Sequence, residues 1–217
     1  MKKLLIKEFR IASSPLSYIF IAAAVMTMLP GYPILMGSFF ICLGLFYSFL
    51  NARETNDVLY TVMLPVRKRD FVNAKYSFAV IIELAGFVIC AALTAVRMIF
   101  LSSSPVYVNN ALLNASPVYL AFTLLVFSVF NMFFIGGFFR TAYKIGMPFI
   151  IFGAAAFIII AVAEALPHFP GLEFLNSPAG ERLGVQLTAL VCAFLIYCVT
   201  TVLSCRMAGN RFEKIDL

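Results

Sequence analysis

One polar interval, residues 51–76, divides a chain that is otherwise strongly apolar, and it limits what the chain can fold into. The interval carries five of the 16 Lys and Arg residues together with three acidic residues, and a long apolar run flanks it on each side. Its charged residues are Arg53, Glu54, Asp57, Arg67, Lys68, Arg69, Asp70 and Lys75. Such a segment has to stay in contact with water, whatever surrounds the apolar runs.

The apolar runs predict helices that cross a membrane. Of the 217 residues, 63% are hydrophobic and only 12% are charged, whereas charged residues make up about a quarter of a soluble domain. The run 118–139 contains no charged residue. Because every backbone amide in lipid needs an internal partner, such runs fold as helices, and no period-two alternation supports a β-barrel. The sequence predicts an all-α, polytopic integral membrane protein with a single transmembrane domain, 1–217.

Six membrane spans are expected, at residues 16–29, 34–50, 77–101, 118–139, 147–166 and 185–205. The first is short for a bilayer, which takes ~20 helical residues, and the turn Pro30-Gly31-Tyr32-Pro33 separates it from the second. With six spans, all Lys and Arg residues except Arg97 and Arg182 fall on one side. Because basic loops stay in the cytoplasm, both termini and the polar interval are predicted to be cytoplasmic.

The first residues, 1–14, predict an amphipathic helix that lies in the membrane interface. Lys3, Lys7 and Arg10 share one helical face, and Met1, Leu5, Phe9 and Ala12 share the opposite face. Ser14 is suited to cap the next helix and Pro15 to its first turn. A cleaved signal peptide is the alternative, but no small-residue cleavage site leads into a polar mature segment.

Within the polar interval, residues 54–64 predict a short amphipathic helix. Its apolar stripe consists of the i, i+4 pairs Val58 with Val62 and Leu59 with Met63. A stripe of this kind is typical of a helix that docks in a groove of a partner protein. Leu64-Pro65 is expected to end the helix, because the residue before proline avoids the helical region. A second helix from about Arg67 then leads into the next span.

The basic triplet Arg67-Lys68-Arg69 has a simpler explanation as well. It would hold the loop against anionic lipid, at roughly 1 kcal/mol per basic residue. Lipid binding alone does not need the acidic and apolar pattern that precedes the triplet. We therefore favour docking to a partner protein, with contact to membrane lipid compatible with it.

A distinctive pattern follows the second span: Glu54, then Leu64-Pro65-Val66, Arg69, Val72 and Ala74-Lys75-Tyr76. This pattern resembles the cytosolic loop of ABC-2 type permeases, the membrane subunits of ATP-binding-cassette transporters. The layout of nearly the whole chain is also similar, with an interfacial helix, two spans, this loop and four more spans. The resemblance is to small bacterial permeases that move peptides or confer immunity to them, including those of phenol-soluble modulin exporters.

The resemblance implies that residues 54–64 form a coupling helix seated on a separate ATPase. The residues expected to couple to the ATPase are Glu54, Asp57, Val58, Leu59, Val62, Met63, Leu64, Pro65, Arg67 and Arg69. It also implies two copies of an ABC ATPase, and a second permease that completes a homodimer around a shared path. The expected location is the bacterial cytoplasmic membrane, and the expected substrate is a hydrophobic or amphipathic molecule such as an antimicrobial or modulin-like peptide.

No cofactor is expected in this chain itself. The sequence has no GxxxxGK[ST] phosphate loop, whose backbone amides and lysine would cradle the phosphates of ATP. By the resemblance, ATP and Mg²⁺ would bind to the partner ATPase. The chain also lacks the extended outer domain that larger members carry between their last two spans, which argues against a substrate that needs a large external exit structure.

Polar residues inside the spans are the candidates for a substrate path: Glu83, Arg97, Asn131 and Glu164. A charge at the centre of a span costs about 2.5–3.5 kcal/mol on insertion scales, so each charged side chain is expected to face protein or water. Arg97 and Glu164 lie near the outer ends of their spans with opposite charge. We expect them to pair with each other or to snorkel, and a role in substrate binding is the alternative.

Glu83 lies two turns into its predicted span, where it would face Arg140 or Lys144, or a positively charged substrate. Asn131 is expected to form hydrogen bonds between helices rather than to contact a ligand. Small residues at Gly136, Gly137 and Gly153 are expected to let helices pack closely.

Other classes of function find less support. An intramembrane protease would need clustered ligands or a nucleophile with its base, but the single histidine, His168, falls in a loop. The five cysteines lie in apolar runs without a CxxC motif, so no metal site is expected. The net charge of +6 is spread over separate loops, which favours membrane topology over nucleic-acid binding. A non-transporting membrane anchor or immunity protein that binds a toxin peptide remains the alternative.

Overall fold

The computed structural model describes residues 2–141, 144–176 and 182–215, and these parts are helical with no β-strand. The first six helices are α1 (Lys2–Lys7), η1 (Glu8–Ala12), α2 (Pro15–Ile19), η2 (Phe20–Met28), α3 (Met36–Glu54) and α4 (Asp57–Met63). They are followed by α5 (Lys68–Phe100), α6 (Pro105–Val108), α7 (Pro117–Val129), η3 (Phe130–Ile135) and α8 (Gly136–Thr141). The last are α9 (Gly146–Ala165), η4 (Leu166–His168), η5 (Glu173–Asn176) and α10 (Leu183–Phe212). The predicted all-α class is confirmed.

Five of the helical segments are long and apolar enough to cross a membrane: Met36–Glu54, Lys68–Phe100, Pro117–Thr141, Gly146–His168 and Leu183–Phe212. A sixth candidate is the pair Lys2–Ala12 and Pro15–Met28, which meet at a bend of 95°. Ser14 caps the second member of this pair, with its side chain accepting from Leu16 N–H, and Pro15 occupies the first turn, as predicted. The chain is therefore a multi-pass membrane protein, with five to six spans among the residues that the structure describes.

The short first span gains length from its geometry. Its nine residues Phe20–Met28 form a 3₁₀-helix, which rises about 2.0 Å per residue rather than the ~1.5 Å of an α-helix. Together with the five residues of α2, the segment reaches roughly 25 Å by these two rises. This is close to the ~30 Å thickness of the hydrocarbon core, so the 3₁₀ winding lets a short segment cross most of a bilayer.

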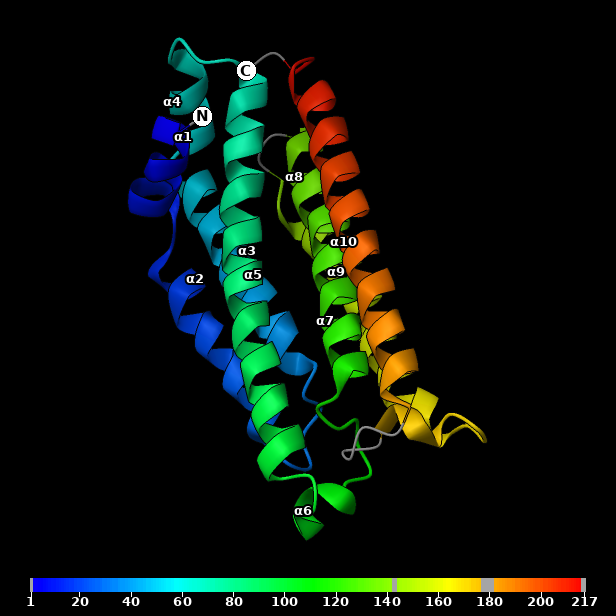
Figure 1. The fold of residues 1–217 in the computed structure, drawn as a ribbon. Helices are drawn as coiled ribbons and strands as arrows, with labels where there is room; N and C mark the ends of the chain where they lie inside the picture. The colour runs from blue at the N-terminus through cyan, green and yellow to red at the C-terminus, as the bar shows by residue number, and fades with distance from the viewer. Residues whose placement is uncertain (1, 142–143, 177–181, 216–217) are drawn as a thin grey trace.

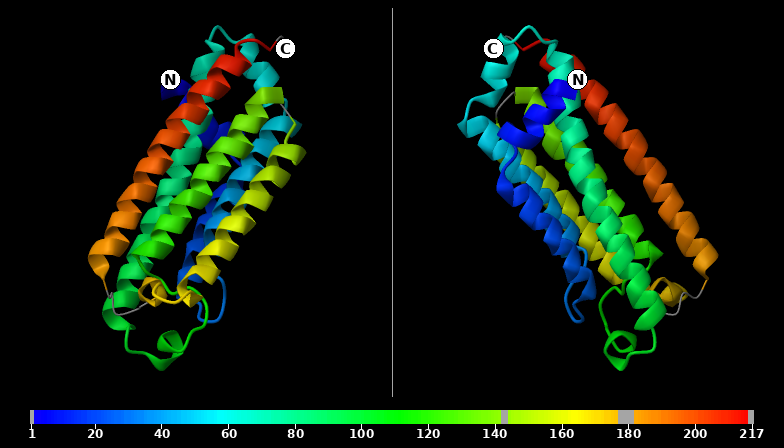
Figure 2. Two further views of the ribbon diagram at one scale, coloured as in Figure 1. Left: turned by 90° about the vertical axis from the view of Figure 1, so that its right-hand side faces the viewer. Right: turned by 60° about the vertical axis from the view of Figure 1, so that its left-hand side comes forward.

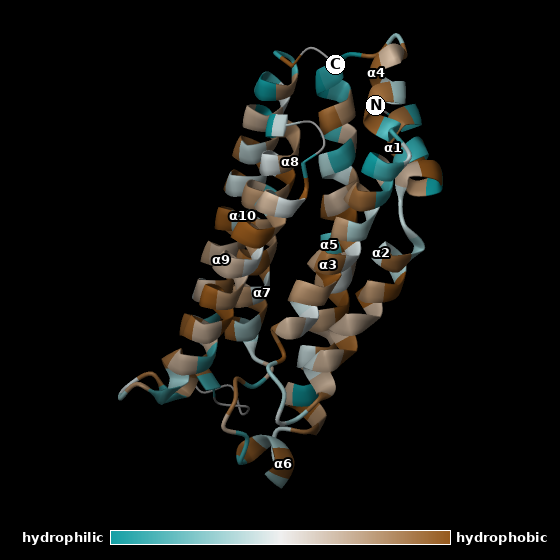
Figure 3. Cartoon of the chain, turned by 180° about the vertical axis from the view of Figure 1, so that it is seen from behind, coloured by the Kyte–Doolittle hydropathy of each residue, from teal (hydrophilic) through white to brown (hydrophobic). Residues whose placement is uncertain are grey.

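The spans stand side by side in one bundle, and both ends of the described chain lie at the same end of it (Figures 1 and 2). This end, which we call the basic end, also carries α1, α4, the start of α5 and the end of α10. Figure 3 shows that hydrophilic residues gather there, whereas the middle of the bundle is hydrophobic. The short helix α6 marks the opposite end. The separation matches the one-sided distribution of Lys and Arg in the sequence.

Two helices extend well beyond their predicted spans. The helix α5 begins at Lys68 and runs for 33 residues without a break, so the second helix predicted from about Arg67 is present and is continuous with the span expected from residue 77. The helix α10 continues beyond the span expected to end at residue 205, as far as Phe212. Both extensions lie at the basic end, where Lys68 Nζ donates a hydrogen bond to the Ile215 carbonyl at 2.7 Å. The polar ends of these helices are thus stabilised against each other outside the apolar zone.

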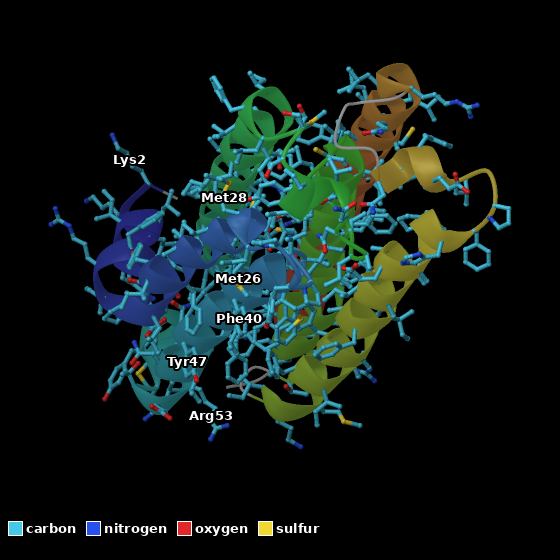
Figure 4. The ribbon with its side chains drawn as sticks, turned by 90° about the horizontal axis from the view of Figure 1, so that it is seen from below. Lys2, Met26, Met28, Phe40, Tyr47 and Arg53 are labelled. Atoms are coloured by element: carbon cyan, nitrogen blue, oxygen red, sulfur yellow. The ribbon has the colours of Figure 1, made fainter. Side chains whose placement is uncertain are left out.

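The first span packs closely against α3 through a glycine. A Cβ atom at Gly44 would lie 2.7 Å from the Cβ of Phe20, so no larger residue fits without a shift. On either side of this contact the Phe20 ring stacks with Phe40 and Tyr47, each with ring centroids 6.2 Å apart. Figure 4 shows the bundle from below relative to Figure 1, away from the basic end, with Phe40 and Tyr47 labelled.

Candidate functional site

The helix α4 connects the first two spans of the bundle to the long helix α5 at the basic end (Figure 1). It is set off on both sides by non-helical backbone. Asn56 before it has a left-handed conformation with φ 52°, which asparagine tolerates better than most residues. Leu64 after it is extended, with ψ 155°, as expected for the residue before a proline. The predicted short helix is therefore present, with Asp57 as its first residue.

The apolar stripe predicted for this helix is divided between two faces. Val58 is buried and belongs to the hydrophobic core, and Val62 packs against that core. Leu59 and Met63 point outward and are 41% and 71% exposed. The stripe is therefore wrong as a single docking surface, because Val58 and Val62 already serve the packing of the chain itself.

Two further apolar side chains complete the outward face. Tyr60 is 66% exposed and Leu64 is 51% exposed. We call Leu59, Tyr60, Met63 and Leu64 the α4 outer face. Tyr60 was not predicted to belong to this face, although its i, i+3 spacing to Met63 is the signal that could have identified it.

A cluster of four charges holds the inner face of α4 in place. Lys7 Nζ lies 2.6 Å from Asp57 Oδ1 and 3.1 Å from Glu8 Oε1. Lys75 Nζ lies 2.6 Å from Glu8 Oε2 and 3.3 Å from Asp57 Oδ2. Glu8 and Lys75 are buried, so removal of either charge leaves the other in a poorly solvated site. We call these four residues the charge cluster; it joins α1 and η1 to α4 and α5.

Neighbouring groups support the charge cluster. Lys7 Nζ donates a hydrogen bond to Thr61 Oγ1 at 2.7 Å, and Thr61 is buried on the inner face of α4. The two ammonium groups also lie over the ring of Phe71, at 5.1 Å for Lys7 and 5.6 Å for Lys75. Lys7, which was predicted to share one helical face with Lys3 and Arg10, therefore points into the protein. Glu8, Thr61 and Lys75 had not been recognised as partners, since they lie far apart in the sequence.

An open hollow of about 710 Å³ lies beside the α4 outer face. Its lining consists of Lys2, Lys3, Leu4, Lys7, Leu64, Pro65, Val66, Arg67 and Asp70. The lining combines apolar side chains with more basic than acidic groups. Among the other predicted coupling residues, Glu54 is exposed at the end of α3, and Arg69 is exposed with its stem packed against Gly209 of α10.

In the middle of the bundle, Glu83 lies in a buried polar junction between three helices. Its Oε2 accepts hydrogen bonds from Asn131 Nδ2 at 2.9 Å and from Tyr197 OH at 2.7 Å. Asn131 Nδ2 also donates to Thr201 Oγ1 at 3.1 Å. Within the described parts of the chain, neither Arg140 nor Lys144 forms an ion pair with Glu83. The expectation that Asn131 bonds between helices is confirmed.

The backbone around Asn131 is adapted to this junction. Asn131 lies in η3, a π-helical turn inside the span Pro117–Thr141. Its carbonyl oxygen accepts hydrogen bonds from Tyr76 OH at 3.2 Å and from Ser204 Oγ at 2.8 Å. A π-helical turn frees carbonyl groups from the regular helical pattern, so α5 and α10 both bind the backbone of η3.

Arg97 and Glu164 do not pair with each other in the described structure. Each has its own partners at the end of the bundle opposite the basic end. The guanidinium group of Arg97 donates to the Thr27 carbonyl at 2.6 Å and to Asn114 Oδ1 at 3.0 Å. Glu164 Oε2 accepts from Leu113 N–H at 2.7 Å. Arg97 thus satisfies a carbonyl at the end of the first span, where a positive charge is favourable.

Comparison with known proteins agrees with this arrangement. The model of a family described as ABC-2 family transporter protein matches residues 3–208, which is nearly the whole chain and includes α4 and all but the last residues of α10. No curated protein and no solved structure matches the chain. The chain belongs to the ABC-2 family of transporter proteins.

Proposed function

We propose that the chain is the permease subunit of an ATP-driven exporter in the bacterial cytoplasmic membrane. Family membership supports a membrane subunit that works with an ABC ATPase. We propose further that two permeases and two ATPase chains form the transporter, that ATP and Mg²⁺ bind to the ATPase chains, and that the substrate is a hydrophobic or amphipathic peptide of the antimicrobial or modulin type. The basic end would then face the cytoplasm.

The α4 outer face is the observation that carries the proposal. Leu59, Tyr60 and Met63 are exposed at the basic end, beside charged residues rather than in the apolar middle of the bundle. Apolar surface left in water costs about 25 cal/mol per Å², and a contiguous exposed patch marks an interaction site. An ATPase with an apolar groove for α4 and acidic residues facing the basic hollow would cover both surfaces.

The charge cluster would transmit a movement of the ATPase contact to the spans. Asp57 is the first residue of α4, and it is bound to Lys7 of α1 and to Lys75 of α5. A shift of α4 would therefore move the interfacial helix and α5 together, since separating the ions would cost more than moving them as a unit. We propose this as the means by which ATP hydrolysis reaches the membrane part of the chain.

The substrate path, in this proposal, lies between two permeases rather than inside one chain. Glu83 and Asn131 are fully buried, and Arg97 is nearly so, so these candidate residues are enclosed by their own helices. A second copy packed against this one would create the shared surface that a single chain lacks.

The proposal is tested by co-purification. A tagged wild-type chain is used to identify its ABC ATPase, and the complex is then assembled with Leu59→Asp and Met63→Asp variants. We expect both variants to fold and to lose the ATPase, whereas the conservative variant Tyr60→Phe retains it. Full retention of the ATPase by the folded Asp variants would contradict docking at α4. Peptide binding by a chain that never associates with an ATPase would instead favour the anchor or immunity protein.

A further inference from the structure

The carboxyl group of Glu83 has no positive partner in the parts of the chain that the structure describes. Glu83 is fully buried near the middle of α5, and its hydrogen-bond donors, Asn131 and Tyr197, are neutral. An ionised carboxylate in such a place costs several kcal/mol unless a cation or enough donors compensate it. Two donors to one oxygen leave the charge of the other oxygen uncompensated.

One polar atom on Glu83 and one on Asn131 lack a hydrogen-bond partner in the described structure. Glu83 Oε1 and Asn131 Oδ1 are both buried without a hydrogen-bond partner in the described structure. Both are acceptors when Glu83 is ionised, so neither can satisfy the other. If Oε1 carries a proton, it becomes a donor, and Asn131 Oδ1 is the unsatisfied acceptor on the residue that already binds Oε2. A single proton shared between the two atoms would remove both deficits.

We propose that Glu83 is a proton-binding site within the membrane part of this chain, and that the bound proton lies on Oε1 and is shared with Asn131 Oδ1. The acid and the amide then form two parallel hydrogen bonds, Asn131 Nδ2–H to Glu83 Oε2 and Glu83 Oε1–H to Asn131 Oδ1. The neutral pair holds α5 to η3, while Tyr197 and Thr201 attach α10 to the same two side chains.

A groove between α5 and α10 gives the proton a route from the basic end. One hollow of about 270 Å³ is lined by Arg69, Asn73, Val202, Cys205 and Arg206. A second of about 280 Å³ shares three of these residues and adds Tyr76, Ser77, Val80 and Thr201. The two hollows share part of their lining, and the second is lined in part by Thr201, which is hydrogen-bonded to Asn131. Water in this groove would come within two side chains of Glu83.

The other ionisable groups near the junction bear on any pH dependence. They are Cys42 on α3, Tyr76 on α5, Tyr197, Cys198 and Cys205 on α10, and Arg211 toward the basic end of α10. The thiols and phenols are neutral at neutral pH in their ordinary state. Arg211 is the cation among these groups, and it forms no ion pair with Glu83 in the described structure.

Infrared spectroscopy of the full chain in lipid vesicles tests the proposal without an ATPase. At neutral pH we expect the wild-type chain to show the carbonyl-stretch band of a protonated carboxylic acid, and we expect Glu83→Gln to lose that band. Glu164→Gln is the matched control, because Glu164 is a carboxyl group in a different span, Gly146–His168, and this variant should retain the Glu83 band. A wild-type spectrum without such a band, or a band lost only in Glu164→Gln, would overturn the proposal.

Thermal unfolding gives a second test that does not depend on assigning a band. The glutamine side chain in Glu83→Gln reproduces the neutral acid, with an N–H donor in place of the O–H, so this variant should fold like the wild type at neutral pH. Deprotonation leaves a buried uncompensated charge only in the wild type. We therefore expect the unfolding temperature of the wild type to fall faster than that of Glu83→Gln as the pH is raised, and parallel curves would count against a bound proton.

Discussion

Lys75 Nζ on the long helix α5 lies 2.6 Å from Glu8 Oε2 on the N-terminal segment, and both side chains are buried. The contact joins residues that lie far apart in the sequence, and Lys7 and Asp57 complete it as a neutral cluster. Ion pairs therefore hold the N-terminal segment to α4, the helix that we propose as the ATPase contact.

Removal of one charge from the cluster should destabilise the chain strongly. We expect Lys75→Ala to lower the free energy of unfolding by about 3–5 kcal/mol, because Glu8 would remain buried without its closest cation. The double variant Glu8→Gln with Lys75→Met should lose less than the sum of the two single changes, since no buried charge is then left unpaired at this contact. Chemical unfolding in detergent measures both, and strict additivity would refute coupling between the pair.

The two faces of α4 should respond differently to truncation. Val58→Ala should lower the free energy of unfolding by about 2 kcal/mol, because it removes buried methyl groups from the core. Leu59→Ala changes an exposed side chain and should alter stability by less than about 0.5 kcal/mol. The same unfolding assay compares them directly, and an equal loss at both positions would mean that the assigned orientation of α4 is wrong.

Arg97 should stabilise the end of the first span. In Arg97→Met the Thr27 carbonyl loses its buried donor, and the cost is expected to be about 1–3 kcal/mol. Arg182 is the matched control, because it is exposed and lies 4.9 Å from the Phe174 ring, a contact worth about 0.5–1 kcal/mol. Hydrogen exchange should show faster exchange near the end of the first span, in η2 and the turn after it, only in Arg97→Met. Unchanged exchange there would argue against the capping role.

Two glycines provide a test of close helix packing. Gly44→Ala should destabilise by about 1–3 kcal/mol, because the added methyl group would overlap Phe20. Gly153 was expected to be a packing site as well, but a Cβ there meets nothing within 4 Å in this chain. Gly153→Ala should therefore stabilise α9 by about 0.5–1 kcal/mol through helix propensity. Unfolding temperatures that move in the same direction for both variants would contradict this distinction.

The sequence was sufficient for those features that depend on local pattern. Hydropathy placed the spans, Leu64-Pro65 marked the end of α4, and Ser14-Pro15 marked the start of α2, because each rests on a few neighbouring residues. Gly136 and Gly137 do lie close to other helices, with a Cβ at Gly137 falling 2.9 Å from Pro148 Cβ.

Tertiary contacts were beyond the reach of the sequence pattern. Which face of α4 points inward could not be predicted from the sequence. Val58 and Leu59 are both apolar, and only the position of the core decides which of them is buried. The partners of Glu83 were missed for a related reason, because Tyr197 and Thr201 are far along the chain and read as ordinary span residues. The pairing of Arg97 with Glu164 was wrong, since Arg97 is instead bound by a backbone carbonyl, which every residue has and which no pattern reveals.

The docking of an ATPase on the α4 outer face is tested most directly by site-specific photo-crosslinking in intact membranes. A photoreactive residue at Met63 should form a covalent adduct with the ABC ATPase, and one at Ile150, which is comparably exposed on α9, should not. This result would place the ATPase on α4. A complex that contains the ATPase but gives no adduct at Met63 or at Tyr60 would contradict the account.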